Sequence, residues 1–249
     1  MTRILLLLFT LLSLQTLQAQ EKYKNAEGFY NLSGFEVSSG LYLLENKTFF
    51  YFSSFGNVDL KLYGTYTISK NNTISLNVSK NLLADFFLFG RNNSKLSSGL
   101  SFSYYKPYKQ NAENIYLISN TTKTPFPKFT ASSKSTTLHI VPKNKKQVKI
   151  GYKLAQNKPE ASIHIADSIN EIKIYHNYYA EMTKQVATTQ FKINNDKLTT
   201  PSNFSNGKTI QKKELSEAVK QQVNQYIEKD KNQNHILRDN NLYYKLELY

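Results

Sequence analysis

Four histidines and eighteen acidic residues are the side chains that could carry metal or acid–base chemistry in this chain. His139 and His164 each stand between two apolar residues, so strand alternation places both on the polar side of a sheet. Neither belongs to a His-Glu-x-x-His or His-x-His pattern, and cysteine, a frequent ligand of structural zinc, is absent. We therefore expect no metal site and no cofactor.

The serines and carboxylates lack the patterns that catalysis usually needs. No Gly-x-Ser-x-Gly elbow occurs, and thiol chemistry is impossible without cysteine. Glu160, Asp167 and Glu171 lie in or near predicted loops and do not form an evident acid–base pair. No glycine-rich phosphate loop is present either. We predict no catalytic residues. The sequence favours a protein that is not an enzyme, and an enzyme is the alternative.

Tyrosine is the residue type whose abundance favours binding. Several tyrosines stand in pairs at or near the ends of predicted strands, where about half of the side chains face solvent. Exposed tyrosine suits contacts with proteins or carbohydrates because its ring is large and amphipathic. Tryptophan, which sugar-binding platforms favour, is absent, so a protein partner is favoured over a glycan. The predicted binding residues are Tyr104, Tyr105, Tyr108, Tyr175, Tyr178 and Tyr179; the alternative is that tyrosine serves only as a good strand residue.

The first nineteen residues are typical of a secretory signal peptide. A single cation, Arg3, precedes an apolar stretch too short to span a bilayer, and a small residue, Ala19, ends the segment. We expect cleavage after Ala19 and export of residues 20–249 to the periplasm or the extracellular space. An exported eukaryotic protein of this size usually carries disulfides, so the lack of cysteine favours a bacterial protein. No later apolar run approaches the length of a membrane span, so we expect no transmembrane helix in the mature chain.

The chain is strongly basic, with a formal net charge of +14 and an isoelectric point near 9.6. Nearly all of the positive charge is lysine, because Arg3, Arg91 and Arg238 are the only arginines. Specific recognition of phosphates and bases depends largely on the forked guanidinium group of arginine. We therefore predict a lysine-coated surface and no nucleic-acid partner.

Residues 20–90 read as an antiparallel β module. Strand-forming runs at 41–44 and 48–52 flank a short polar turn, and a second such pair lies at 66–68 and 74–78. Another run covers 60–63, and Gly64 after it predicts a bulge or bend.

Residues 28–79 also resemble a module found in bacterial exported proteins. In that module a Gly-Leu-x-Leu strand pairs with an aromatic strand, followed by a Ser-x-Gly-x-x-Asp turn and a Gly-x-Trp strand. The corresponding segments here are 40–43, 48–52, 54–59 and 64–66, with Tyr66 in place of the tryptophan. The family is functionally uncharacterised, so the resemblance implies export and a β-sandwich-like fold but no activity.

Residues 95–249 form a second predicted β-rich region. It contains several short strands, and a polar connection at 121–135 interrupts them with Pro125 and Pro127. Apolar residues at three- and four-residue spacing predict a helix at 212–230, with Thr209 as its N-cap. Alternating residues predict a terminal strand at 242–249.

These features predict a mainly β protein: an antiparallel, β-sandwich-like N-terminal module plus a second β region with one C-terminal helix. We expect an exported bacterial protein with a non-catalytic binding or envelope-scaffolding role, and an envelope protein or a surface polymer as its partner. Two alternatives stay open. One is a hydrolase acting on envelope polymers. The other is a small outer-membrane β-barrel, although most predicted strands are shorter than the roughly nine to eleven residues that spanning requires.

Overall fold

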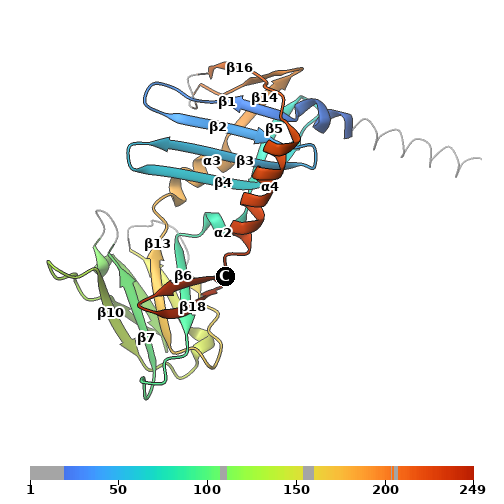
Figure 1. Ribbon diagram of the computed structural model, residues 1–249. Coiled ribbons are helices and arrows are strands. Elements are labelled where there is room, and N and C mark those ends of the chain that lie inside the picture. Colours follow the sequence, from blue (N-terminus) through green and yellow to red (C-terminus); the bar gives the residue numbers. More distant parts are fainter. Residues whose placement is uncertain (1–19, 107–110, 154–159, 203, 205–206) are drawn as a thin grey trace, which may run out of the picture. The chain divides into compact units, whose positions relative to one another are not determined.

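The computed structural model describes residues 20–106, 111–153, 160–202, 204 and 207–249 (Figure 1). The fold is mainly β, with antiparallel sheets and one long helix near the C-terminus, as the sequence predicts. Within the described residues, no helix combines the length and apolar character that crossing a membrane requires.

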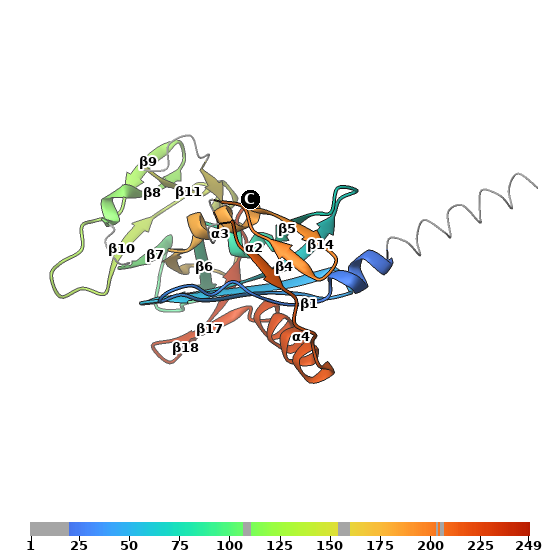
Figure 2. The same cartoon turned by 90° about the horizontal axis from the view of Figure 1, so that it is seen from above.

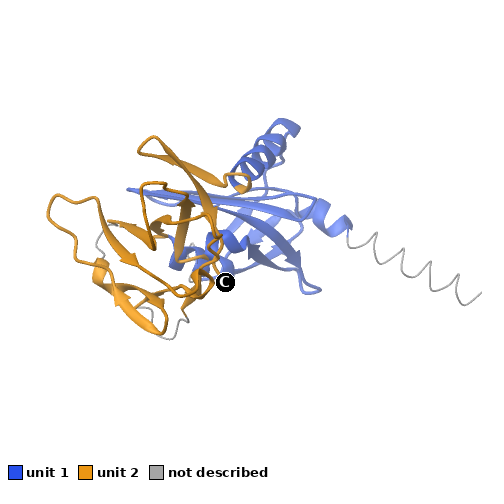
Figure 3. Ribbon diagram, turned by 90° about the horizontal axis from the view of Figure 1, so that it is seen from below, with its two compact units in different colours: residues 1–83, 179–230 blue, residues 84–178, 231–249 orange. Residues whose placement is uncertain are grey.

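The chain divides into two compact units that are interleaved in sequence (Figure 3). Unit 1 takes residues 1–83 and 179–230, and unit 2 takes 84–178 and 231–249. This differs from the expected consecutive division near residues 90–95, because 179–230 joins the first unit. The pairing of Phe191 with Ile74 explains the difference, since it continues the N-terminal sheet with strands from much later in the chain.

Unit 1 is built on an antiparallel sheet of eight strands. In spatial order these are β1 (Gly28–Asn31), β2 (Ser38–Leu43), β3 (Thr48–Phe55), β4 (Val58–Ile68), β5 (Thr73–Val78), β14 (Gln190–Asn194), β15 (Lys197–Thr199) and β16 (Thr209–Gln211). Beyond β16, Lys213 pairs with Phe29 of β1 through two backbone hydrogen bonds of 2.9 and 2.8 Å. The sheet therefore returns to its first strand and encloses a core that includes Tyr30, Phe49 and Phe191.

The strand β4 runs without interruption through Gly64, so the predicted bulge or bend there is wrong. Gly64 pairs with Phe49 on one side and Val78 on the other in unbroken register. A Cβ atom at this position would lie 2.0 Å from the carbonyl oxygen of Asn77. Glycine is required here because a neighbouring backbone approaches closely, not because the strand turns.

Unit 1 also contains a helical segment at 20–26 and the helices α2 (Lys80–Leu83), α3 (Ala180–Thr188) and α4 (Glu217–Lys231). Adjacent residues of β3 pack on opposite faces of the sheet. Phe49 joins the core that Val186 of α3 enters, whereas Phe50 packs with Val223 and Ile227 of α4. The helix α4 thus lies against the other face of β3 and β4 (Figure 2).

The predicted C-terminal helix exists but begins later than expected. Ser216 caps α4, because its Oγ accepts a hydrogen bond from the backbone N–H of Val219 at 3.4 Å. Thr209, the expected cap, lies in β16 instead. Residues 212 and 213 cannot be helical because their backbone N–H groups donate to the carbonyl oxygens of Asp196 and Phe29.

Unit 2 contains two sheets. The six-stranded sheet has the order β10 (Ser135–Ile140), β7 (Leu100–Tyr105), β13 (Glu171–His176), β6 (Phe86–Arg91), β18 (Asn241–Leu246), β17 (His235–Arg238), and only β7 and β13 are parallel. The four-stranded sheet has the order β12 (Ala161–Ser162), β11 (Lys149–Tyr152), β8 (Ile115–Ser119), β9 (Thr122–Pro125). Short 3₁₀ turns lie at η1 (Ala112–Asn114) and η2 (Lys145–Gln147).

A single core cluster draws residues from both sheets of unit 2. Phe102 and Ile174 come from the larger sheet, and Leu117 and Ile150 from the smaller one. The strand β9 falls inside the segment 121–135 that we expected to be a connection without strands. Pro125 is tolerated there because it ends an edge strand.

Candidate binding face

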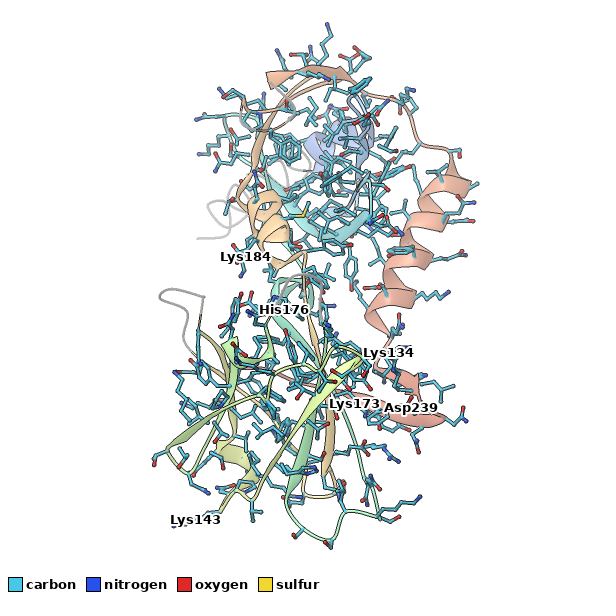
Figure 4. All side chains as sticks on the ribbon, turned by 90° about the vertical axis from the view of Figure 1, so that its left-hand side faces the viewer. Lys134, Lys143, Lys173, His176, Lys184 and Asp239 are labelled. Carbon is cyan, nitrogen blue, oxygen red and sulfur yellow. The ribbon has the colours of Figure 1, made fainter. Side chains whose placement is uncertain are left out.

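The candidate site is the face of the six-stranded sheet that points away from the core of unit 2, called here the outer face. Along β13, Ile172 and Ile174 enter the core, so Glu171, Lys173 and Tyr175 point the other way. The ladder register places Arg91 of β6 opposite Glu171. Parallel pairing of β13 with β7, and the alternation along β7, bring Tyr105 to the same face as Lys173, which is labelled in Figure 4.

The carboxylate of Glu171 is the centre of the polar network on this face. Its Oε2 accepts from Nε of Arg91 at 2.8 Å and from Nδ2 of Asn93 at 2.9 Å, and it lies 2.7 Å from Nη2 of Arg91. Its Oε1 accepts from the hydroxyl of Tyr243 at 2.9 Å and lies 3.3 Å from Nζ of Lys173. Both carboxylate oxygens are therefore occupied by donors from four different residues.

The charge state of Glu171 follows from these partners. Burial alone would raise the pKa of its carboxyl group, but the hydrogen bond from Tyr243 and the charges of Lys173 and Arg91 outweigh burial and lower the pKa. Glu171 is thus held as a carboxylate. A general acid needs a raised pKa, so this residue serves ion pairing and not proton donation.

Lys173 brings a cation into a largely buried position, with 8% of its surface exposed. Its Nζ lies 5.7 Å from the ring centroid of Tyr105 and 5.4 Å from that of Tyr243, so it faces two aromatic rings as well as Glu171. Burial would lower the pKa of this ammonium group, but the hydroxyls of the two tyrosines and Glu171 raise it overall. Lys173 stays charged.

The rings of Tyr105 and Tyr175 are stacked beside this cation, with centroids 4.7 Å apart and planes 11° from parallel. Phe89 contacts Tyr175 edge-on at 6.0 Å, and the guanidinium of Arg238 lies 4.8 Å from the centroid of Tyr105. Burial raises the pKa of Tyr175 to about 12. Both stacked tyrosines are only half-buried, so part of the pair stays accessible on a rigid sheet.

The outer face carries more positive than negative charge. Lys173 and Arg238 lie beside the ring of Tyr105 and Arg91 lies over the ring of Tyr243, while Glu171 neutralises one of these three charges. Asp239 adds a second carboxylate next to Arg238, whereas Lys245 adds another cation over Phe87. Such a surface can attract an anionic group and present flat rings on which a planar or apolar part of a partner packs.

The predicted binding tyrosines do not form a single surface. Tyr105 and Tyr175 lie together on the outer face. Tyr104 is fully buried, with its hydroxyl 3.4 Å from Nδ1 of His176, so it is not available for a surface contact. It points inward because it follows the same alternation as Phe102.

The remaining predicted tyrosines lie elsewhere. Tyr178 is 44% exposed, and its ring centroid lies 5.9 Å from that of His176. Tyr179 packs against the core of unit 1. Tyr108 lies outside the described residues.

Sequence reasoning missed the charged half of the outer face. Arg91, Glu171, Lys173, Tyr243 and Arg238 come from four strands, and their proximity depends on pairings that sequence spacing does not reveal. One local signal was present: Glu171, Lys173 and Tyr175 alternate with Ile172 and Ile174, which indicates a polar face opposite an apolar one.

The histidines do not gather. His139 is in β10 of the larger sheet, whereas His164 follows β12 of the smaller one. In the part of the chain that the structure describes, no group of three or more His, Asp or Glu side chains is placed to hold a metal ion.

A hollow in unit 1 differs in character from the outer face. It is open, has a volume of about 510 Å³ and is lined partly by Glu27, Glu217 and Lys220. Nζ of Lys220 lies 2.5 Å from Glu27 and 2.9 Å from Glu217, so these charged groups satisfy one another. A second hollow of about 170 Å³ is lined partly by Lys22, Asn72 and Asn195.

Comparison with known protein families, with curated proteins and with solved structures finds no match for this chain. The outer face is therefore interpreted from its own geometry.

Proposed function

We propose that this protein is an exported bacterial binding protein without catalytic activity, and that the outer face of unit 2 contacts an acidic partner in the cell envelope. The observation that carries the proposal is the stack of Tyr105 and Tyr175 with two cations close to the ring of Tyr105, Arg238 at 4.8 Å and Lys173 at 5.7 Å from its centroid. Aromatic rings and arginine are the side chains that most often dominate binding energy at protein contacts.

The arrangement supports binding in two further ways. The strands β6, β7 and β13 are central in their sheet, so the rings are held on a rigid surface and lose little freedom when a partner binds. The lowered pKa of Glu171 keeps the ion-pair network intact near neutral pH, so the cations stay in place. A partner bearing carboxylate or phosphate groups fits the excess of positive charge, whether it is an envelope protein or a surface polymer.

The test is affinity capture from the native envelope fraction with the immobilised protein, washed at low and then at high salt. We expect a partner that survives high salt. Replacing both stacked rings, by Tyr105→Ala with Tyr175→Ala, should release it, whereas Tyr249→Ala removes a 71% exposed tyrosine elsewhere in unit 2 and should not.

A charge variant separates specific binding from general attraction. Arg238→Gln removes a cation that contacts Tyr105, and the control Lys143→Gln removes an exposed cation elsewhere in unit 2 (Figure 4). We expect weaker capture only for Arg238→Gln. If all bound material leaves at high salt, or if both variants weaken capture equally, diffuse lysine charge explains the binding and the proposal is wrong.

A further inference from the structure

The strand β17 leaves one edge of the six-stranded sheet unpaired. Within the described residues β17 pairs only with β18, and the turn between them contains Asp239 and Asn240 at φ +51° and +58°. The N–H of Lys245 donates to the carbonyl of Asn234 at 2.7 Å. Because bonded pairs alternate in an antiparallel ladder, residues 234, 236 and 238 bond toward β18. His235 and Leu237 therefore direct their N–H and C=O groups outward.

Apolar side chains lie beside this free edge. Leu237 is 71% exposed, Leu242 opposite it is 41% exposed, and Tyr244 on the same face is 52% exposed. Natural edge strands are usually protected by charged side chains, proline, a bulge or very short length. The strand His235–Arg238 has four residues and one charged side chain, Arg238, which lies over the ring of Tyr105; it contains neither lysine nor proline, and its register with β18 is continuous. Free backbone groups next to exposed leucines are typical of a surface that pairs with another strand.

We propose that β17 pairs with β17 of a second copy of this chain, antiparallel and about a two-fold axis at Ile236. In this register His235 of each copy lies opposite Leu237 of the other, which uses all the outward backbone groups and forms four new hydrogen bonds. No other register in β17 uses both residues, because the strand turns at Asp239.

The side chains are compatible with this symmetric register. Ile236 lies opposite its own copy, His235 opposite Leu237, and Asn234 opposite Arg238, so no like charges meet directly across the seam. The exposed Leu237, Leu242 and Tyr244 of both copies then lie on one face of the joined sheet. The opposite edge of the sheet, β10, instead exposes Thr137 and His139 and offers no such apolar strip.

Pairing in this way affects the proposed binding face. A two-fold axis perpendicular to the sheet keeps both outer faces on the same side. The two copies of β13 would then lie on opposite sides of the seam, each separated from it by its own β6, β18 and β17. A long partner could then contact both faces at once and gain avidity. This consequence rests on the proposed function, whereas the pairing of β17 does not.

The first test uses single cysteines, which are unambiguous because the chain has none of its own. Ile236→Cys places the two thiols in a non-hydrogen-bonded pair, where the Cα atoms are about 4.5 Å apart and a disulfide can form. Under a mild oxidant we expect this variant to form a covalent dimer much faster than Thr137→Cys, the control on the exposed edge strand β10. A mixture of His235→Cys and Leu237→Cys should form the mixed disulfide in preference to either symmetric one. Equal rates for Ile236→Cys and Thr137→Cys overturn the proposal.

The second test needs no cysteine. Sedimentation equilibrium of the purified protein, with concentration raised into the sub-millimolar range, should show a reversible dimer. Leu237→Lys should raise its dissociation constant about tenfold or more, because a buried leucine on each side of the seam is lost, while Thr137→Lys adds the same charge and should leave it unchanged. A protein that stays monomeric across this range, or a dimer insensitive to Leu237→Lys, contradicts the pairing. Because these measurements contain no envelope partner, their failure is distinct from failure of the proposed function.

Discussion

At the scale of single residues, Glu171 determines whether the outer face can hold its cations. Its side chain is 12% exposed and forms ion pairs with both Arg91 and Lys173, whose side chains are 21% and 10% exposed. Replacing Glu171 by Gln leaves two partly buried cations near each other, so we expect a loss of about 2 kcal/mol in the free energy of unfolding. Urea unfolding measures this loss of free energy, and hydrogen exchange of the β6 and β13 amides shows whether protection is lost in these strands.

The matched control is Glu113→Gln in the same unit. Its ion pair with Lys128 is 3.9 Å long, and Lys128 is 83% exposed. We expect a change below about 0.5 kcal/mol, because exposed ion pairs contribute little. Equal effects of the two substitutions would contradict the central role of Glu171.

The lowered pKa of Glu171 also predicts a pH dependence. Its folded-state pKa lies below the ordinary value of 4.5, so on acidification the unfolded chain takes up the proton first. The stability that Glu171 contributes is complete above the ordinary value and is lost as pH falls through the folded-state pKa. We expect the difference in urea midpoint between wild type and Glu171→Gln to shrink steadily below about pH 4.5. A difference that is constant between neutral and strongly acidic pH would show that the ion pairs are not its source.

At the scale of elements, Gly64 tests whether β4 and β5 approach as closely as their register implies. In Gly64→Ala the new Cβ would meet the carbonyl oxygen of Asn77 at 2.0 Å, and a backbone atom within a ladder cannot move freely. We expect unit 1 to lose about 2–3 kcal/mol of stability by urea unfolding. Gly34→Ala has nothing within 4 Å and should change stability by less than about 0.5 kcal/mol. Equal effects at the two glycines would mean that β4 and β5 are farther apart at Gly64 than this register implies.

The start of α4 offers a second test at this scale. Ser216→Ala removes the hydroxyl that accepts from Val219, and we expect a loss of about 1 kcal/mol with faster amide exchange in the first turn of α4. Thr209→Ala lies in β16 and loses only the hydroxyl contact with Thr199, so α4 should be unaffected. A larger effect of Thr209→Ala than of Ser216→Ala on α4 would indicate that Thr209 is the cap.

The elements that could be predicted from sequence are those specified by neighbouring residues. The hairpin of β2 and β3 and the helix α4 follow from local alternation, turn residues and apolar spacing. The helix start was misplaced because pairing of Lys213 with Phe29, far away in sequence, extends the strand region past Gln211. The site was predictable to the same extent. Tyr105 and Tyr175 could be selected as residues near strand ends, whereas Lys173 and Arg238 reach the ring of Tyr105 only through pairings between distant strands.

At the scale of the whole molecule, the interleaving of the two units is the least local feature. The strand β5 pairs with β14 across more than a hundred residues, and β6 pairs with β18 across an even longer separation. No composition change marks these returns of the chain, so sequence alone suggested two consecutive regions. Each unit instead depends on two separate segments.

This arrangement predicts an asymmetric response to truncation. Removing residues 233–249 deletes β17 and β18, which exposes the edge of β6 and removes Leu246 and Leu248 from the core of unit 2. Unit 1 keeps all of its strands and the helix α4, including the hydrogen bond of 2.9 Å from the hydroxyl of Tyr63 to Asp230. Hydrogen exchange should therefore show lost protection across the strands of 84–178 and retained protection in 20–83 and 179–230. The control is Tyr249→Ala, which leaves β18 intact, keeps the two backbone hydrogen bonds between residue 249 and Ser162, and should leave both patterns unchanged. Equal loss of protection in both units would show that they unfold together, because local loss of core contacts in unit 2 cannot by itself open the closed sheet of unit 1.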